Sequence, residues 1–166
     1  AQSFAERVKP CSIVDLAAIT SIYRPGPLSA GVDRQFVDAK NNPQYVKYLN
    51  STVREITEET YGFLIFQEQI ALLAHKLGKN LSLDEGNLLR KVLTKKGTGK
   101  GHEVKEGIYN KFIEGCEDKR IPRKQADRLW STFEYFSGYG FNKSHAVSYS
   151  IISYQCAWLF NYYSTE

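Results

Sequence analysis

The stretch Gly138–His145, GYGFNKSH, lies between two helical patterns and opens the longer of them, residues 144–163. Its two glycines tolerate positive φ and close backbone approach, so they favour a turn that displays the following side chains at a helix start. The exposed N–H groups and positive dipole end of a helix start favour an anion such as phosphate, which Lys143 and His145 would reinforce. A glycine C-cap followed by a Ser or Asn N-cap explains the same residues without any function, and the turn alone favours this simpler interpretation.

On both sides of this turn, apolar residues at helical spacing dominate the chain. With 166 residues, the chain is long enough for one substantial core and short for two. The sequence predicts a mainly α fold, an irregular domain 1–166 of about seven or eight helices, with at most a short strand near 61–66. The expected helices cover residues 12–23, 30–39, 67–76, 82–95, 102–118, 122–136 and 144–163, with one or two short helices within 44–60.

Local signals fix several of these helix ends. Ser12 is expected to cap the first helix, and Ser82 with Glu85 forms the pattern of a capping box. The run 61–66 is either a short strand or a buried approach to the next helix. Aromatic residues at helical spacing are far more often core than base-stacking platforms, so we expect four of them to be buried: Trp130, Phe133, Tyr154 and Trp158.

The basic charge of the chain is concentrated in one segment. Lys and Arg exceed Asp and Glu by 22 to 18, and the pI is about 8.9. Between Arg90 and Lys105, six cations face only Glu103, a local +5 that accounts for the whole excess. Cations at a helix C-terminus are explained by the dipole alone. However, the charge continues into Lys96–Gly101, a glycine-rich basic loop that suits an extended polyanion and lacks the spacing of a Walker loop.

A third basic position is Arg24, which begins the segment Arg24-Pro-Gly-Pro27. Each proline disfavours helical geometry in the residue before it, so we expect a rigid turn that fixes where Arg24 points. An arginine on such a turn is a fair phosphate ligand, while a helix stop with a solvated arginine explains the pattern equally well.

The remaining chemistry-bearing residues indicate neither catalysis nor a metal site. Three cysteines, far apart and without a C-x-x-C motif, favour reduced thiols in a cytoplasmic protein. The three histidines have no carboxylate or thiol at ligand spacing, so we predict no catalytic and no metal-binding residue. No apolar run is long enough to span a membrane. The absence of Met favours a fragment of a larger protein, although removal of an initiator Met before Ala1 is an alternative.

Four motifs occur in the same order as in the bacterial DNA polymerase III alpha subunits, the C-family replicative polymerases. They are Ala17–Leu28 (AAITSIYRPGPL), Tyr61–Gln69 (YGFLIFQEQ), Leu88–Lys96 (LLRKVLTKK) and Gly138–Tyr149 (GYGFNKSHAVSY). The chain thus resembles the helical fingers region of that family over nearly its whole length, and an assignment of residues 1–28 to the edge of the palm is an alternative. The resemblance implies part of a DNA-directed DNA polymerase, a nucleotidyltransferase that extends a primer and releases pyrophosphate.

The resemblance also implies roles for particular residues. Arg90, Lys91, Lys95 and Lys96 would grip the triphosphate of the incoming deoxynucleotide, with Arg24 assisting. The wall of the nascent base-pair pocket would be formed by Tyr139, Asn142, Lys143, Ser144 and His145. Where the family usually has two arginines, this chain has Arg90 and Lys91, and Thr94 stands where a glycine is common before the lysine pair. Lysine keeps the charge but loses the bidentate fork, which weakens the assignment of Lys91 more than that of Arg90.

The implied cofactor and partners lie largely outside the chain. Mg²⁺ would be held by palm aspartates that have no counterpart here, so the fragment alone is expected to be inactive. The expected partners are primer–template DNA, deoxynucleoside triphosphates, the remaining polymerase domains and, through the parent, a sliding clamp and other replisome proteins. Two other function classes stay open: a non-catalytic helical nucleic-acid-binding module, and a protein-interaction bundle with a solvated basic face.

Overall fold

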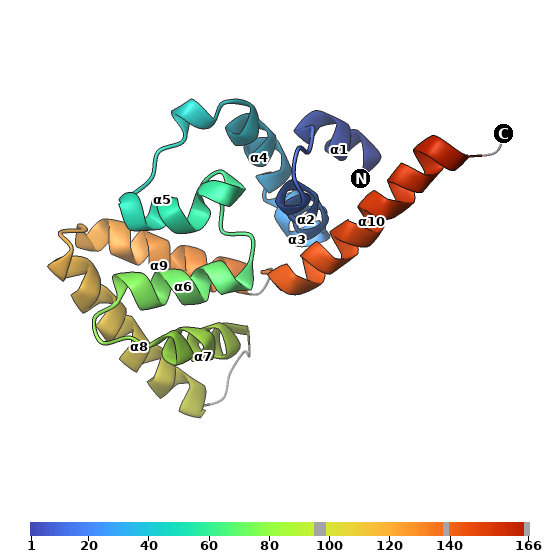
Figure 1. Cartoon of the computed structure of the whole chain (residues 1–166). Coiled ribbons are helices and arrows are strands. Elements are labelled where there is room, and N and C mark those ends of the chain that lie inside the picture. Colours follow the sequence, from blue (N-terminus) through green and yellow to red (C-terminus); the bar gives the residue numbers. More distant parts are fainter. Residues whose placement is uncertain (95–98, 138–139, 165–166) are drawn as a thin grey trace. The chain divides into compact units, whose positions relative to one another are not determined.

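The computed structural model describes residues 1–94, 99–137 and 140–164 (Figure 1). Over these ranges the chain forms α-helices and two 3₁₀ helices (η) without a sheet, which confirms the mainly α prediction. The elements are α1 (Gln2–Val8), α2 (Ile13–Ile22), α3 (Pro25–Ser29), α4 (Val32–Asn41), η1 (Pro43–Tyr45), α5 (Ser51–Thr57), η2 (Glu58–Thr60), α6 (Gln67–Leu77), α7 (Leu83–Thr94), α8 (Gly99–Asp118), α9 (Arg123–Ser137) and α10 (Lys143–Tyr163). The described part thus holds ten α-helices, more than the seven or eight expected, because α1 and α3 are short helices that the sequence pattern did not reveal.

The helices gather into two compact units. The first unit combines Ala1–Val46 with Phe141–Glu166, and the second is the continuous stretch Lys47–Gly140. The expectation that residues 1–166 act as a single domain stays a prediction, and each unit is described by itself.

In the first unit, α10 packs along α2. The Ser12 side chain accepts a hydrogen bond from the backbone N–H of Asp15 at 3.1 Å, which confirms the expected cap of α2. On α10, Ala146 and Ser150 are buried. The Ser150 hydroxyl donates to the carbonyl of Ala146 at 2.7 Å, so it leaves no unmatched donor in the contact. Small residues at these positions allow the two helices to approach closely.

The prolines after Arg24 do not form the rigid non-helical turn that we expected. Pro25 is instead the first residue of α3, and the backbone N–H of Leu28 donates to the carbonyl of Arg24 at 3.0 Å. A proline in the first turn of a helix is well tolerated because the missing N–H has no intrahelical acceptor there. Arg24 itself is the extended residue that precedes the helix.

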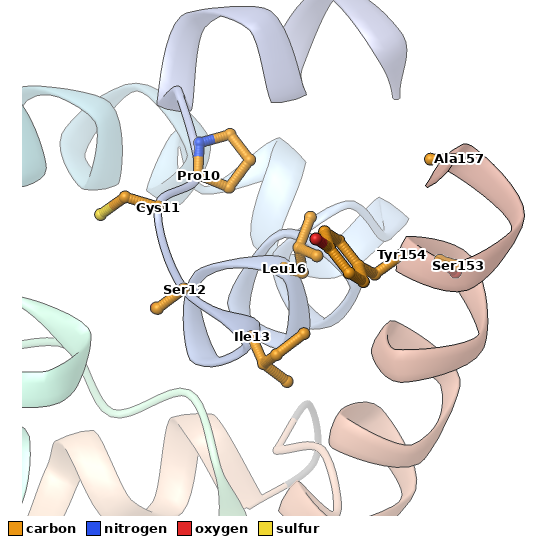
Figure 2. Close-up of a pocket in the computed structure, with 8 residues that line it drawn as sticks. All are labelled: Pro10, Cys11, Ser12, Ile13, Leu16, Ser153, Tyr154 and Ala157. Carbon is orange, nitrogen blue, oxygen red and sulfur yellow. The ribbon is translucent and has the colours of Figure 1, made fainter. Parts of the chain in front are cut away.

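The prediction that Tyr154 and Trp158 belong to the core is wrong. Their exposed fractions are 55% and 44%. Tyr154 lies at the edge of an apolar pocket of about 610 Å³, where its ring lies beside Leu16 of α2 (Figure 2). Apolar residues occupy nearly the whole circumference of α10, so periodicity alone could not select the face that packs against α2.

The second unit contains a continuous apolar core built by α5 to α9. Trp130 and Phe133 lie in it, as predicted, and Phe112 contacts both rings. The buried members are Val53, Leu64, Ile70, Leu73, Ala74, Leu77, Leu81, Leu89, Ile108, Phe112, Ile113, Cys116, Ile121, Ala126, Trp130 and Phe133. The core fixes the mutual placement of α6 and α7, the helices that carry Glu68 and Arg90.

The start of α6 is fastened by a buried amide. Within the described ranges the run 61–66 forms no strand, and its last three residues, Leu64 to Phe66, lead as a buried segment into α6, the second of the two expectations. The Gln69 side-chain oxygen accepts from the backbone N–H groups of Ile65 and Phe66, at 2.9 and 3.0 Å. Its side-chain nitrogen donates to the Thr60 hydroxyl at 2.8 Å. Gln69 therefore has a structural role, because its polar atoms are engaged by the protein itself.

Candidate functional site

The basic end of α7 is positioned by its packing against α6. Arg90 points an Nη1 atom toward the Glu68 carboxylate of α6, at 3.7 Å, and the two side chains are 22% and 33% exposed. Glu68 lies in the first turn of α6, where the helix dipole also favours a negative charge. The next residue, Lys91, is exposed to solvent. Arg90 thus combines a positive charge with partial burial and a directional ion pair, and Lys91 is a more exposed cation of the same helix end.

Lys95 and Lys96, the other two residues of the predicted triphosphate grip, lie outside the described residues. The capping box at the opposite end of α7 is confirmed. The Ser82 hydroxyl accepts from the N–H of Glu85 at 3.1 Å, and the Glu85 carboxylate accepts from the N–H of Ser82 at 2.9 Å. Lys111 of α8 also pairs with Glu85, and this hydrogen bond lowers the pKa of that carboxyl from its ordinary value. The helix that carries Arg90 is therefore fixed at its N-terminus and along its buried face.

In the first unit, the start of α10 is capped by Asn142. Its side-chain oxygen accepts from the backbone N–H of His145 at 2.9 Å, so the helix begins at Lys143, one residue earlier than expected. Ser144 and His145 are exposed, while Lys143 is half-buried. Because the amide oxygen of Asn142 is used for capping, this residue shapes the helix start, and the residues after it present their side chains in the first turn.

Arg24 lies against the residue that precedes this cap. Its guanidinium carbon is 4.8 Å from the centroid of the Phe141 ring, within the range of a cation–π contact. Its Nε donates to the Ser21 carbonyl at 2.8 Å. Partial burial lowers the pKa of the Arg24 guanidinium, which nevertheless stays charged at any physiological pH. The structure thus brings Arg24 to the start of α10, beside the segment predicted to form the wall of the base-pair pocket.

An aromatic row continues from Phe141 along α10. The ring centroids of Phe141 and His145 are 5.5 Å apart, and those of His145 and Tyr149 are 4.6 Å apart. Phe141 and Tyr149 were not among the predicted site residues. The four-residue spacing from His145 to Tyr149 was a usable signal, since such positions are neighbours on a helix surface. No local pattern could pair Phe141 with Arg24. Tyr139 lies outside the described residues.

The two basic groups are therefore Arg90 with Lys91 in the second unit, and Arg24 with Lys143 and His145 in the first. The first-unit group lies at a helix N-terminus, where the dipole also favours an anion, whereas Arg90 and Lys91 lie near the C-terminus of α7 and contribute their charges alone. Within the described ranges, no cluster of three or more His, Cys, Asp or Glu residues has the geometry of a metal site. None of the helices described is both long and apolar enough to cross a bilayer. Cys11, Cys116 and Cys156 are free thiols.

Comparisons of the sequence with a family model and with curated proteins point to the same family. Residues 1–120 match the model of the bacterial DNA polymerase III alpha subunit finger domain. The DNA polymerase III subunit alpha of Campylobacter jejuni is 34% identical over 99% of this chain and 13% of its own length. The corresponding subunits of Treponema pallidum and Bacillus subtilis are 37% and 36% identical, over 95% and 98% of this chain and 13% and 14% of their own lengths.

The chain thus spans about an eighth of the length of the curated relatives that it matches. The residues matched by the family model include Arg24 and Arg90, and the alignments with the relatives extend through nearly the whole chain, over 165 residues for the Campylobacter protein. The chain belongs to the family of bacterial DNA polymerase III alpha subunit finger domains.

Proposed function

We propose that this chain is the fingers segment of a DNA-directed DNA polymerase and that it binds the incoming deoxynucleoside triphosphate together with the nascent base pair. The observation that carries the proposal is the arrangement of the cations. Arg90 is partly buried and directed by Glu68, and Arg24 is stacked on Phe141 beside the start of α10. Preorganised cations of this kind stabilise the negative charge of a triphosphate and of the departing pyrophosphate.

In this proposal the triphosphate is held by Arg90, Lys91, Lys95 and Lys96, with Arg24 assisting. The nascent base pair meets a wall formed by Tyr139, Asn142, Lys143, Ser144 and His145. The exposed positions of Ser144 and His145 support direct contact with a ligand. The capping hydrogen bond of Asn142 supports an indirect role, in which this residue holds the first turn of α10 in place.

The reaction itself requires groups from the rest of the polymerase. Two Mg²⁺ ions are the ordinary means by which polymerases stabilise the attacking and leaving oxygens. The described residues do not fit such ions, since they contain no cluster of carboxylates suited to hold them. The proposal therefore assigns the ions to another domain of the parent chain, and the 166-residue fragment alone is inactive. Its partners are primer–template DNA, the other polymerase domains and, through the parent, replisome proteins of the cytoplasm.

Single-nucleotide incorporation by the full-length parent subunit tests this function. Arg90→Ala and Lys143→Ala are each expected to lower kcat/KM for the nucleotide by about 10- to 100-fold, while the affinity for primer–template DNA is retained. Lys76→Ala is a matched control, because Lys76 is an exposed cation on α6 outside both basic groups. Unchanged incorporation by Arg90→Ala and Lys143→Ala would contradict the assignment. DNA binding without any incorporation by the wild type would favour a non-catalytic nucleic-acid-binding module.

A further inference from the structure

We propose that a groove between residues 47–49 and α9 in the second unit binds an unpaired stretch of a nucleic-acid strand. The groove has a volume of about 560 Å³. It is lined by Lys47, Tyr48 and Leu49 and by four residues of α9, Gln125, Arg128, Leu129 and Thr132. The four positions on α9 follow the spacing i, i+3, i+4 and i+7, so they share one face of the helix. None of the residues assigned to the triphosphate or to the base pair lines this groove.

The floor of the groove is apolar. Leu49 and Leu129 are partly buried and pack against the core of the second unit. Tyr48 is half-buried, and the guanidinium of Arg54 lies 5.9 Å from its ring centroid. Burial, with the nearby Glu58 carboxylate, raises the pKa of the Tyr48 phenol, so its ring stays neutral. A neutral aromatic ring beside two leucines is a surface on which a flat, uncharged base can stack.

The rim of the groove is positively charged. Lys47 and Arg128 are exposed and, within the described part of the chain, neither has an ion pair. The nearby carboxylates are already engaged, since Glu58 pairs with Arg54 at 3.1 Å and Asp127 accepts from the Tyr109 hydroxyl at 2.6 Å. Arg128 lies in the N-terminal half of α9, where the helix dipole gives no reason for a cation. Its charge is therefore available to a ligand.

The combination selects the ligand. Lys47 and Arg128 match phosphates, and the apolar floor with Tyr48 matches a base, whereas an acidic peptide would leave that floor unused. The base faces are available for stacking only in an unpaired strand, since those of a duplex are covered by their neighbours. Gln125 adds an amide that can donate to or accept from any base, and Thr132, whose hydroxyl donates to the Arg128 carbonyl at 2.9 Å, can still accept a hydrogen bond. The inference rests on the proposed function, because a polymerase template supplies such an unpaired strand.

The test uses fluorescence anisotropy of the full-length parent subunit with two labelled probes, a 20-nucleotide oligothymidylate and a blunt 20-base-pair duplex. Arg128→Glu is expected to weaken binding of the single strand about tenfold. It should also reduce the slope of log affinity against log salt concentration by about one. Tyr48→Ala is expected to weaken it about fivefold with an unchanged salt slope, and Tyr48→Phe to restore it, because stacking needs only the ring. Duplex affinity should stay constant in all variants. Lys76→Glu, the same charge reversal on α6, should stay within about twofold of wild type.

Three results would overturn the groove assignment. If Arg128→Glu and Lys76→Glu lost equal affinity for the single strand, the effect would come only from the net charge of the protein. Equal losses for duplex and single strand would exclude a site for unpaired strands. A polyglutamate peptide that loses affinity in Arg128→Glu, while the oligothymidylate does not, would identify an acidic peptide as the ligand. Weaker single-strand binding in Arg128→Glu together with normal incorporation by Arg90→Ala would uphold the groove and contradict the proposed nucleotide site. Unchanged single-strand binding in Arg128→Glu together with reduced incorporation by Arg90→Ala would contradict the groove and uphold the proposed nucleotide site.

Discussion

The guanidinium of Arg24 lies 4.8 Å from the centroid of the Phe141 ring, so the residue that precedes α3 is stacked on a residue that precedes α10. The same Phe141 ring also neighbours His145, whose ring centroid is 5.5 Å away. Phe141 therefore contacts two residues of the proposed nucleotide site and has no charge of its own. Its expected role is to position them.

Phe141→Leu keeps an apolar side chain and removes the aromatic face, so we expect kcat/KM for the incoming nucleotide to fall about three- to tenfold, the size of a partly buried cation–π contact. Phe141→Tyr keeps the face and should stay close to wild type. Steady-state incorporation by the parent subunit measures both. A Tyr variant as impaired as the Leu variant would contradict the role of the ring face.

In the proposed nucleotide site, the Glu68 carboxylate, which pairs with Arg90, would compete with phosphate for that guanidinium. Glu68→Gln keeps the size of the side chain and removes its charge, so we expect KM for the nucleotide to fall about two- to fivefold with kcat retained, as befits a partly exposed ion pair. Nucleotide titration of the incorporation rate measures the effect. Glu55→Gln, which removes an exposed charge on α5, is the control. A raised KM in Glu68→Gln would mean that Glu68 chiefly holds Arg90 in position.

Two glycines in helices are expected to respond in opposite ways to alanine. A Cβ at Gly86 would lie 2.5 Å from the carbonyl oxygen of Ala71, so Gly86→Ala forces α6 and α7 apart and should destabilise the fold by about 1–3 kcal/mol. A Cβ at Gly107 meets nothing within 4 Å, and Gly107→Ala should stabilise α8 by about 0.5–1 kcal/mol. Urea denaturation of the 166-residue chain measures both. Similar midpoints for the two variants would contradict the close packing of α6 on α7.

Burial raises the pKa of the Cys116 thiol from 9.0 to about 11. Above pH 9 the unfolded chain loses this proton before the folded chain does, so the free energy of unfolding should fall between pH 9 and 11, by about 1.4 kcal/mol per pH unit. Cys116→Ala should remove this part of the slope. At neutral pH, mass spectrometry should find Cys11 and Cys156 alkylated well before Cys116, because only those two are exposed. Equal alkylation rates would contradict the burial.

Helix starts could be predicted from the sequence where the signal is local. The caps by Ser12 and by Ser82 with Glu85 each depend on a hydrogen bond across three residues, which the order of residues specifies directly. The prediction of a rigid non-helical turn after Arg24 was wrong because Pro25 is compatible with both a turn and a first helical position. Local sequence rules limit each helix end to a few conformations, and packing in the rest of the fold selects one of them.

The contacts that organise the candidate site could not be predicted in the same way. Glu68 with Arg90, and Arg24 with Phe141, join segments that are far apart in the sequence. Composition and spacing identified the cations but not the partners that direct them. The partners appear only after the helices pack, and packing depends on which apolar faces meet.

The apolar surface of α10 has a consequence for how the 166 residues behave in solution. From Ser144 to Tyr163 the helix contains no Asp, Glu, Lys or Arg, and Ile152, Leu159 and Phe160 are among its exposed side chains. Water-exposed surface of this kind favours colloidal association. In isolation, the fragment should therefore form reversible clusters at high protein concentration, and sulfate should promote them, because kosmotropic salts strengthen apolar contacts. Light scattering of the purified fragment would measure this association, which we expect to depend on α10.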